Sequence, residues 1–295
     1  MMPVRLVKEW IIEGLLFLSA LLSVLVTVGI VAVLLVETAG FFKVVSLVDF
    51  LTDTEWTPLF SEKHYGILPL FVGTFLTTSI AMAVALPVGL ISAIYLSEYA
   101  SRGIREIIKP LLEILAAIPT VVYGYFALIF VTPLLQGFIP ALSGFNALSP
   151  GIVMGIMIIP IISSLSEDAM HAVPAGLKEG GYALGSTRLQ VALKVVLPAA
   201  FSGVVSSFIL GISRAVGETM IVAIAAGLQP RLTLNPFVPI ETVTAYIVQI
   251  SMGDTPTGTI AYQTIFVAGM SLFLLTFILN IVSYLLRKRF REVYD

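Results

Sequence analysis

GLLFLSALLSVLVTVGIVAVLLV, residues 14–36, is an unbroken apolar stretch without a single charged side chain. The hydrocarbon core of a bilayer is about 30 Å thick, and a helix needs about 20 apolar residues to cross it. The apolar core of a secretory signal peptide is shorter, about 7–15 residues. We therefore expect residues 14–36 to form a retained transmembrane helix.

The composition extends this expectation to the whole chain. Of its 295 residues, 58% are hydrophobic and 12% are charged, whereas soluble domains average roughly 45–50% apolar and about 25% charged residues. With a net charge of −2 there is no basic footprint for nucleic acid, and membrane lipid is the expected surrounding. The absence of cysteine and the presence of only two histidines, His64 and His171, predict no metal centre and no cofactor.

Charge-poor runs of helix-spanning length recur along the chain. The runs cover residues 14–36, 65–97, 114–166, 195–230 and 255–286. The third run is too long for one helix, and FIPALSGFNALSPG (138–151) divides it with prolines, glycines, serines and an asparagine. The sequence therefore predicts an all-α, polytopic membrane protein with six transmembrane helices.

The positions of lysine and arginine predict the orientation of these helices, because cytoplasmic loops retain basic residues. Twelve lie in the two tails and in the loops after the second and fourth spans: Arg5, Lys8, Arg102, Arg105, Lys109, Lys178, Arg188, Lys194, Arg287, Lys288, Arg289 and Arg291. The alternate loops hold only Lys43, Lys63 and Arg231. Both termini are therefore expected in the cytoplasm, with the protein in the cytoplasmic (inner) membrane.

The predicted cytoplasmic stretch 167–198 is long for a connection between neighbouring spans. Its apolar residues have a spacing typical of short amphipathic helices on either side of Gly185. Gly180 and Gly181 fall inside the first of these helices, where each costs about 1 kcal/mol relative to alanine. Such a cost indicates a place that another backbone or protein approaches closely.

This loop carries a spaced pattern that resembles the coupling loop of binding-protein-dependent ABC importer permeases. In that family E-A-A is followed by three residues, a glycine, nine residues, an isoleucine, one residue and L-P. The matching residues are Glu179, Gly180, Gly181, Gly185, Val195, Leu197 and Pro198. Here glycines replace the two alanines and Val195 replaces the isoleucine. The resemblance implies a type I (MetI-like) permease fold and a coupling helix that docks on a separate ATPase subunit.

The fifth predicted span contains an arginine and a glutamate, Arg214 and Glu218, in SRAVGETMIV. Ionisable residues at membrane depth cost at least about 2.5–3.5 kcal/mol each, so they usually face the bundle interior and indicate a pathway. Four residues apart on a helix, the two are expected to share a face and pair. Arg214 would then offer bidentate donors to an oxyanion on the translocation route, while Glu218 holds it and partly neutralises it. The alternative is an ion pair that only fixes helix packing.

The string RAVGETM (214–220) narrows the resemblance to the phosphate-specific (Pst) importer permeases, closer to the C-type than to the A-type subunit. IYLSEYA (94–100) and AAIPTVVYGYFAL (116–128) resemble the same subfamily, over about residues 65–290. The resemblance implies translocation of inorganic phosphate. It also implies the partners of such an importer: two copies of an ATP-binding subunit, a homologous second permease, and an extracytoplasmic phosphate-binding protein.

The chain is expected to be a transport subunit and not an enzyme, because no G-x-x-x-x-G-K-[ST] nucleotide loop occurs in it. We expect two parts: residues 1–65, with the N-terminal tail, the first helix and an external loop, and residues 66–290, a five-helix permease core containing the loop 167–198. Two other functions stay open, a permease for sulfate or molybdate and an ion-coupled secondary transporter.

Overall fold

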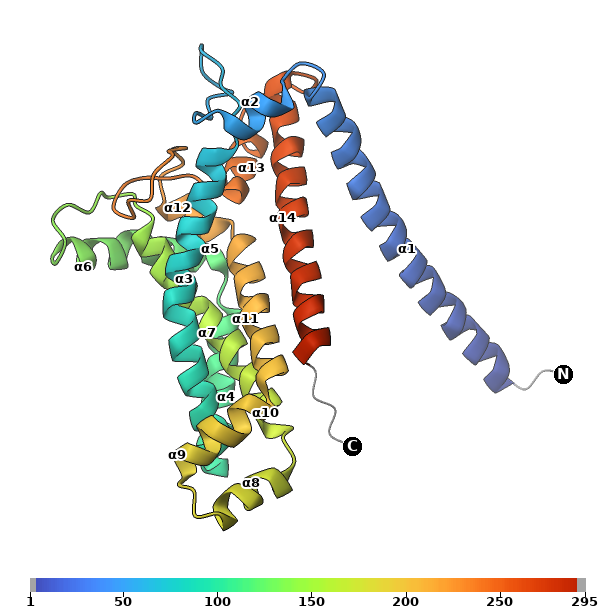
Figure 1. Cartoon of the computed structure of the whole chain (residues 1–295). Coiled ribbons are helices and arrows are strands. Elements are labelled where there is room, and N and C mark those ends of the chain that lie inside the picture. The colour runs from blue at the N-terminus through green and yellow to red at the C-terminus, as the bar shows by residue number, and fades with distance from the viewer. Residues whose placement is uncertain (1–3, 291–295) are drawn as a thin grey trace.

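The computed structural model describes residues 4–290, and it is helical throughout apart from loops and two isolated β-bridges within that range. Several charges of the predicted basic tails lie outside what the structure describes, either whole or in their side chains: Arg5, Lys8, Arg287, Arg289 and Arg291. The helices form an upright bundle with one long helix standing apart from it (Figure 1).

Four helical stretches are long and apolar enough to cross a membrane in one piece. They are α1 (Val4–Phe41), α3 (Leu68–Ile94) with the π-helical turn η1 (Tyr95–Tyr99), α7 (Leu148–His171) and α14 (Ile260–Phe290). The helix α7 continues to His171, so the first residues of the predicted loop 167–198 are helical and the connection begins later than expected.

Two further candidate spans each consist of a sharply bent pair of helices. The first pair is α4 (Arg102–Ala117) and the segment Thr120–Gln136, made of α5 (Thr120–Phe126), η2 (Ala127–Val131) and α6 (Thr132–Gln136). The second is Arg188–Ala199, made of α9 (Arg188–Val191), η3 (Ala192–Val196) and α10 (Leu197–Ala199), followed by α11 (Phe201–Val216). The bends are 86° and 75°.

The first bend has a local cause in the sequence. Ile118 precedes Pro119 and adopts an extended backbone with ψ 129°, as residues before proline commonly do. The second bend lies at Ala200, whose φ of −89° and ψ of 4° leave the helical region. With each bent pair counted as one span, the described residues contain the six predicted spans, two of which are sharply bent.

The remaining short helices lie at the two ends of the bundle: α2 (Leu47–Thr52), α8 (Ala175–Ala183), α12 (Met220–Ala225) and α13 (Val243–Ser251). In Figure 1, α8 is at the bottom and α2 and α13 are at the top. We call these the α8 end and the α13 end.

The centre of the bundle is formed by α3 and α7, which α11 covers. Glycines allow the two central backbones to approach: a Cβ at Gly155 would lie 2.7 Å from the carbonyl oxygen of Ala81. Small residues at helix interfaces permit such close packing in membranes. Buried apolar side chains such as Met154, Ile158 and Ile162 fill the remaining space.

The helix α1 contacts α14 near its C-terminal end and diverges from the bundle along the rest of its length (Figure 1). Thr38 donates a hydrogen bond to the carbonyl oxygen of Phe266 at 3.4 Å, and Gln263 donates one to Glu37 at 3.3 Å. None of the most apolar window of α1 is buried. The part predicted as residues 1–65 therefore meets the core at the α13 end.

Candidate functional site

Glu218 lies at a break between two helices. The helix α11 ends at Val216, Gly217 follows, and α12 begins at Met220. The Glu218 carboxylate accepts hydrogen bonds from the backbone N–H groups of Met220 (3.1 Å) and Ile221 (3.3 Å), and thereby caps α12. The expectation that Arg214 and Glu218 share one continuous helix is therefore wrong, because Glu218 lies beyond the end of α11.

The two residues nevertheless pair. Arg214 Nη1 donates to Glu218 Oε2 at 2.6 Å, and Arg214 Nη2 lies 3.6 Å from the sulfur of Met157 on α7. The Glu218 side chain is 2% exposed, whereas that of Arg214 is 38% exposed. Glu218 thus holds one end of an arginine side chain that stays partly exposed.

The break is also tied to the α13 end of the bundle. Thr244 on α13 donates a hydrogen bond to the backbone oxygen of Glu218 at 2.6 Å, and its hydroxyl lies 3.1 Å from that of Thr242. Thr74 on α3 accepts a hydrogen bond from the N–H of Val243 at 3.2 Å. The start of α13 is therefore anchored both to the central bundle and to the turn that carries Glu218.

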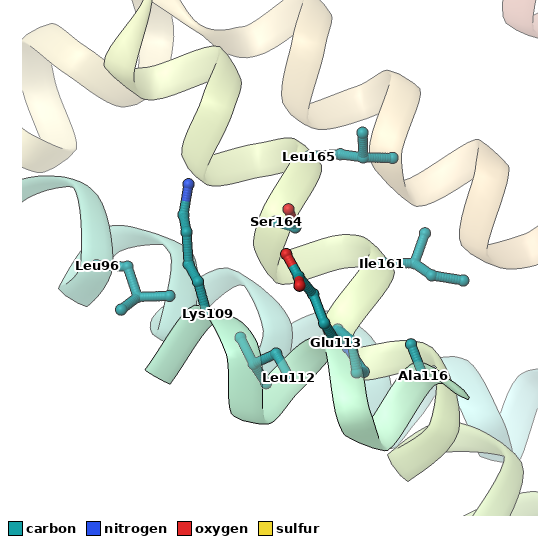
Figure 2. A pocket seen from close by; sticks show the side chains of 9 residues that line it. Leu96, Lys109, Leu112, Glu113, Ala116, Ile161, Ser164 and Leu165 are labelled. Carbon is teal, nitrogen blue, oxygen red and sulfur yellow. The ribbon is translucent and has the colours of Figure 1, made fainter. Parts of the chain in front are cut away.

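A cavity of about 330 Å³ lies between α4 and α7 (Figure 2). On α7 it is lined by Pro160, Ile161, Ser164 and Leu165, which are three, four, seven and eight residues beyond Met157. These spacings place them on the same helix face as Met157. In Figure 2, Lys109 and Glu113 extend from α4 toward this face. A single face of α7 thus leads from the Arg214 contact into the cavity.

The predicted coupling loop forms two helices that meet at Gly185. The helix α8 ends at Ala183, and Gly185 adopts φ +79°, a conformation that side chains other than glycine disfavour. The next helix, α9, starts with a capping box in which Thr187 and Gln190 bind each other's backbone N–H groups. Leu197 and Pro198 begin α10 and belong to the bent fifth span, not to the loop itself.

The two unusual glycines of α8 have different surroundings. A Cβ at Gly181 would lie 3.1 Å from Val191 on α9, so this glycine allows α8 and α9 to pack closely. A Cβ at Gly180 would meet nothing within 4 Å, and neighbouring Glu179 is exposed. No contact among residues 4–290 therefore explains the glycine at position 180.

Large apolar side chains around α8 are exposed: Leu177 is 40%, Tyr182 43%, Leu184 88% and Leu189 54% exposed. They belong to α8 and the residues that follow it, and Figure 1 shows α8 at one end of the bundle. Exposed apolar patches of this kind mark interaction surfaces.

Two contacts that sequence reasoning missed hold the loop against the end of α3. Lys178 on α8 donates to Glu98 at 2.7 Å, and the guanidinium of Arg188 on α9 lies 5.2 Å from the ring centre of Tyr99. Both partners belong to η1. The turn η1 is therefore contacted by α8, which precedes Gly185, and by α9, which follows it. The acid Glu98 within the apolar string IYLSEYA indicates that a cationic partner is needed, but the sequence does not show which lysine or arginine it meets.

A second ionic cluster joins α4 to α7 near the same end. The Glu167 side chain is 1% exposed and pairs with Lys109 and with Arg105, at 3.5 Å from Arg105 Nε. Lys109 also lies 3.4 Å from Asp168. Arg105 Nη2 donates to the backbone oxygen of Leu96 at 2.7 Å, just before η1. Buried carboxylates at the α8 end are thus matched by cations from other helices.

The predicted site residues therefore fall into two separate groups. Arg214 and Glu218 meet within the bundle, while Glu179, Gly180, Gly181 and Gly185 lie on the loop at the α8 end. Among the described residues, no group of three or more histidine, aspartate or glutamate side chains is placed to hold a metal ion.

The sequence is similar to those of known transport proteins. The chain is 36% identical to a probable ABC transporter permease protein, YqgH, of Bacillus subtilis (strain 168), over 92% of this chain and 88% of the relative. It is also 36% identical to the phosphate transport system permease protein PstC of Xylella fastidiosa (strain Temecula1), over 82% of this chain and 79% of the relative.

Solved structures share the fold. A bacterial ABC transporter involved in the import of the acidic polysaccharide alginate matches with a TM-score of 0.63 at 15% identity, over 98% of this chain and all of that one. The MetNI methionine ABC transporter matches with a TM-score of 0.55 at 19% identity, over 77% of this chain and 95% of that one. The model of the binding-protein-dependent transport system inner membrane component family matches residues 85–292, most of the chain. The chain therefore belongs to the family of binding-protein-dependent transport system inner membrane components.

Proposed function

We propose that this chain is the transmembrane permease subunit of an ATP-driven importer of inorganic phosphate. The main support is the partly exposed side chain of Arg214, which the buried Glu218 carboxylate holds at 2.6 Å. A guanidinium presents paired N–H donors that match the oxygens of phosphate. The relatives named as phosphate transport permeases support the choice of phosphate over sulfate or molybdate.

In this proposal the substrate route passes Arg214 and follows the Met157 face of α7 into the cavity beside Ser164. Glu218 weakens the positive potential at Arg214, so that the anion is attracted without being trapped. The cavity is not itself a phosphate site, because Lys109 is already paired with Glu167 and Asp168 and Glu113 adds another acid.

The α8 end would face the cytoplasm, together with both termini. There the exposed side chains of α8 and the open face of Gly180 would dock on one of two ATPase subunits. A homologous second permease would complete the route, and a phosphate-binding protein would dock at the α13 end. The chain would hydrolyse no ATP. It would alternate between outward and inward openings as its partners do so.

Reconstituted uptake tests the function. We expect proteoliposomes with the complete importer, its binding protein and enclosed ATP to accumulate radiolabelled phosphate. Excess unlabelled phosphate should abolish this signal, whereas excess sulfate or molybdate should not. Uptake that continues without ATP, or that sulfate displaces as well as phosphate does, would show that the proposal is wrong.

Substitution of Arg214 tests the route. Arg214→Gln should lower uptake at least about thirtyfold, since the loss of a charged partner in such a site costs about 2–5 kcal/mol. Arg214→Lys should recover only part of it, because the ammonium lacks the planar fork. Arg231→Gln, a change at an exposed arginine bound to Gln229, is the matched control. Normal uptake by Arg214→Gln at normal expression would contradict the route.

The cavity allows an independent test because the chain has no cysteine. Ser164→Cys should react with a water-soluble maleimide in the assembled importer, and the adduct should block uptake. The adjacent Ser163 is 0% exposed, so Ser163→Cys should stay unlabelled. Equal labelling of both positions would remove the cavity from the route.

The open face of Gly180 tests docking of the ATPase. Gly180→Trp has free space within this chain and should leave its folding unchanged. It should nevertheless prevent the ATPase from co-purifying, whereas Gly180→Ala should not. Co-purification of the ATPase with Gly180→Trp would contradict docking at α8.

A further inference from the structure

A second cavity, of about 420 Å³, opens at the α13 end. Two parts of the chain that are far apart in the sequence line it. One is residues 56–60 of the loop after α2, and the other comprises residues 228–230 after α12 together with Glu241, Tyr246 and Gln249 before and within α13. Its size is within the range of small-ligand pockets. Neither the Arg214 route nor the coupling loop uses it.

A buried acid lines this cavity. Glu241 is 1% exposed, and its Oε1 is buried without a hydrogen-bond partner. It is the only residue with a formal charge among those that line the cavity. The other polar groups are those of Thr57, Gln229, Gln249 and the indole and phenol of Trp56 and Tyr246. Arg231 is nearby in sequence, but it is exposed and donates to Gln229 at 2.7 Å.

Burial raises the pKa of Glu241 to about 8, so the side chain is mainly a neutral acid at pH 7. An ionised carboxylate without a counter-charge is strongly disfavoured in such surroundings. A positive charge next to the carboxyl group would favour its ionised form, and the described residues that line the cavity do not supply one.

Several contacts hold the backbone around Glu241 in place. A Cβ at Gly73 on α3 would lie 2.1 Å from the backbone oxygen of Glu241, so the two segments are in close contact. Ile240 pairs with Gly227 in a β-bridge, and Trp56 packs edge-on against Tyr246 with ring centres 5.0 Å apart. The Tyr246 hydroxyl is 2.5 Å from that of Thr264 on α14. These contacts connect the walls of the cavity to α3, α13 and α14.

We propose that this cavity receives a lysine or arginine side chain of the extracytoplasmic binding protein, whose cationic group pairs with Glu241. The inference rests on the proposed function for its orientation, which places the α13 end outside. The charge favours a cation, and the apolar walls from Leu59, Phe60 and Leu228 suit the methylene stem of a long basic side chain. A phosphate ion is excluded as the ligand because the cavity offers it no cation.

The position of Glu241 connects docking to the route. Thr242 and Thr244 follow it directly, and Thr244 binds the backbone oxygen of Glu218. Insertion of the cation converts the neutral acid to a carboxylate and releases one proton to the medium. The new ion pair at Glu241 then lies three residues before Thr244, whose hydroxyl binds the backbone oxygen of Glu218.

Docking measured against pH tests the proposal. The assembled importer in lipid nanodiscs is titrated with its phosphate-loaded binding protein between about pH 6 and pH 9. Because binding displaces a proton, the dissociation constant should fall by up to about tenfold per pH unit below the pKa and level off above it. Glu241→Gln should bind at least about tenfold more weakly at high pH and lose this dependence.

Two variants serve as controls. Asp254→Asn changes an exposed acid beyond the end of α13 and should preserve the wild-type profile. His64→Gln removes another titratable group of this end, whose pKa is raised by its hydrogen bond to Asp53, so a pH profile that persists in this variant belongs to Glu241. Unfolding temperature and ATPase co-purification establish that Glu241→Gln is folded and assembled.

Zero-length carbodiimide coupling gives a second measurement. It should join Glu241 to a lysine of the docked binding protein, identified by mass spectrometry, and replacement of that lysine by glutamine should reproduce the Glu241→Gln profile. If no lysine couples, replacing the binding protein's interface arginines one at a time should do so. Unchanged docking in Glu241→Gln, or a pH profile that depends on sodium and not on a basic residue of the binding protein, would overturn the inference.

These results are distinguishable from failure of the proposed function. If the wild-type importer shows ATPase stimulation by phosphate-loaded binding protein while Glu241→Gln docks normally, only the basic-side-chain site is refuted. If the wild type shows no such stimulation, the phosphate importer itself is refuted.

Discussion

The two ends of the bundle differ in whether their buried carboxylates have a cationic partner within the described part of the chain. At the α8 end, Glu98 pairs with Lys178, and Glu167 pairs with Lys109 and Arg105. At the α13 end, Glu241 is as deeply buried as Glu167, but among the described residues that line its cavity no lysine or arginine faces it. A carboxylate matched within the chain stabilises one arrangement of helices, whereas an unmatched one is a site for a partner's charge. The comparison suggests that internal ion pairs make the α8 end rigid, while the α13 end is completed from outside.

The largest expected effect is at the matched end. Glu167→Gln leaves Lys109 and Arg105 without their buried partner, which should cost about 3–5 kcal/mol of the free energy of unfolding. Asp168→Asn is the control, since that side chain is 62% exposed and its pair should contribute about 1 kcal/mol or less. Thermal unfolding in detergent measures both. Similar melting temperatures for the two variants would break the comparison.

The same substitution at the other end should have the opposite sign. Burial raises the pKa of Glu241 from 4.5 in the unfolded chain to about 8 in the folded one. The folded state therefore loses stability as pH rises from 4.5 to about 8. Glu241→Gln removes that loss and should stabilise the isolated chain by up to about 3 kcal/mol at pH 7, and by little near pH 4.5. Melting curves at both pH values measure it, and a destabilised variant at pH 7 would count against an unmatched acid.

The Lys178–Glu98 pair should matter for coupling more than for folding. Glu98→Gln weakens a charge-assisted hydrogen bond of about 1.5–3 kcal/mol between α8 and η1. ATP hydrolysis should persist while phosphate uptake per ATP falls roughly tenfold. Glu106→Gln, which alters an exposed pair with Arg102, should leave this ratio unchanged. The rates of ATP hydrolysis and phosphate uptake are measured in the same proteoliposomes. A loss of both rates in Glu98→Gln would contradict a role in coupling.

Backbone strain at Gly185 should give a smaller effect. A side chain at φ +79° costs about 1 kcal/mol even though a Cβ there meets nothing within 4 Å. Gly185→Ala should therefore loosen the joint between α8 and α9, measured as faster hydrogen exchange at the following residues. Gly176→Ala, which also meets nothing and has no positive φ, is the control.

The smallest effect is expected at the exposed pair of the α13 end, His64 and Asp53, whose side chains approach to 2.9 Å. The hydrogen bond to Asp53 raises the pKa of His64. Burial raises the pKa of Asp53, but the hydrogen bonds from His64 and the backbone outweigh it and lower the pKa overall. The stabilisation is thus full between about pH 4 and about pH 6.5. It is lost as pH rises through the raised pKa of His64 or falls through the lowered pKa of Asp53.

The difference in melting temperature between wild type and His64→Gln isolates this pair. It should be larger at pH 6 than at pH 9, and the Glu241 contribution is common to both proteins. A difference that grows with pH would contradict the sign.

Sequence patterns predicted what depends on neighbouring residues. Residues 14–36, the spacing around Gly185 and the proximity of Arg214 to Glu218 are local features, and the helices and the ion pair follow them. The functional roles of these residues stay predictions. The break at Gly217 was not predicted, because a charge pair four residues apart has the same spacing whether the helix continues or ends between its members.

Contacts between distant segments were beyond sequence reasoning. Glu98 meets Lys178 across 80 positions, and the cavity at Glu241 takes a wall from residues 56–60. A lone acid in VPIETVTAYI does not reveal whether a cation faces it, since that depends on how α3, α13 and the first loop pack together. Only the assembled fold distinguishes Glu98 from Glu241.

The divergent helix α1 gives the chain a wide footprint in the bilayer. Its uncharged residues 14–36 extend about 35 Å at 1.5 Å per residue, slightly more than the roughly 30 Å hydrocarbon core. Such a length is accommodated by tilting. Because α1 is held near its C-terminal end by Glu37 and Thr38, a change in bilayer thickness alters the angle of the whole helix about that point. Membrane thickness therefore acts on this protein as a torque applied at the α13 end, next to the contacts that support Glu241.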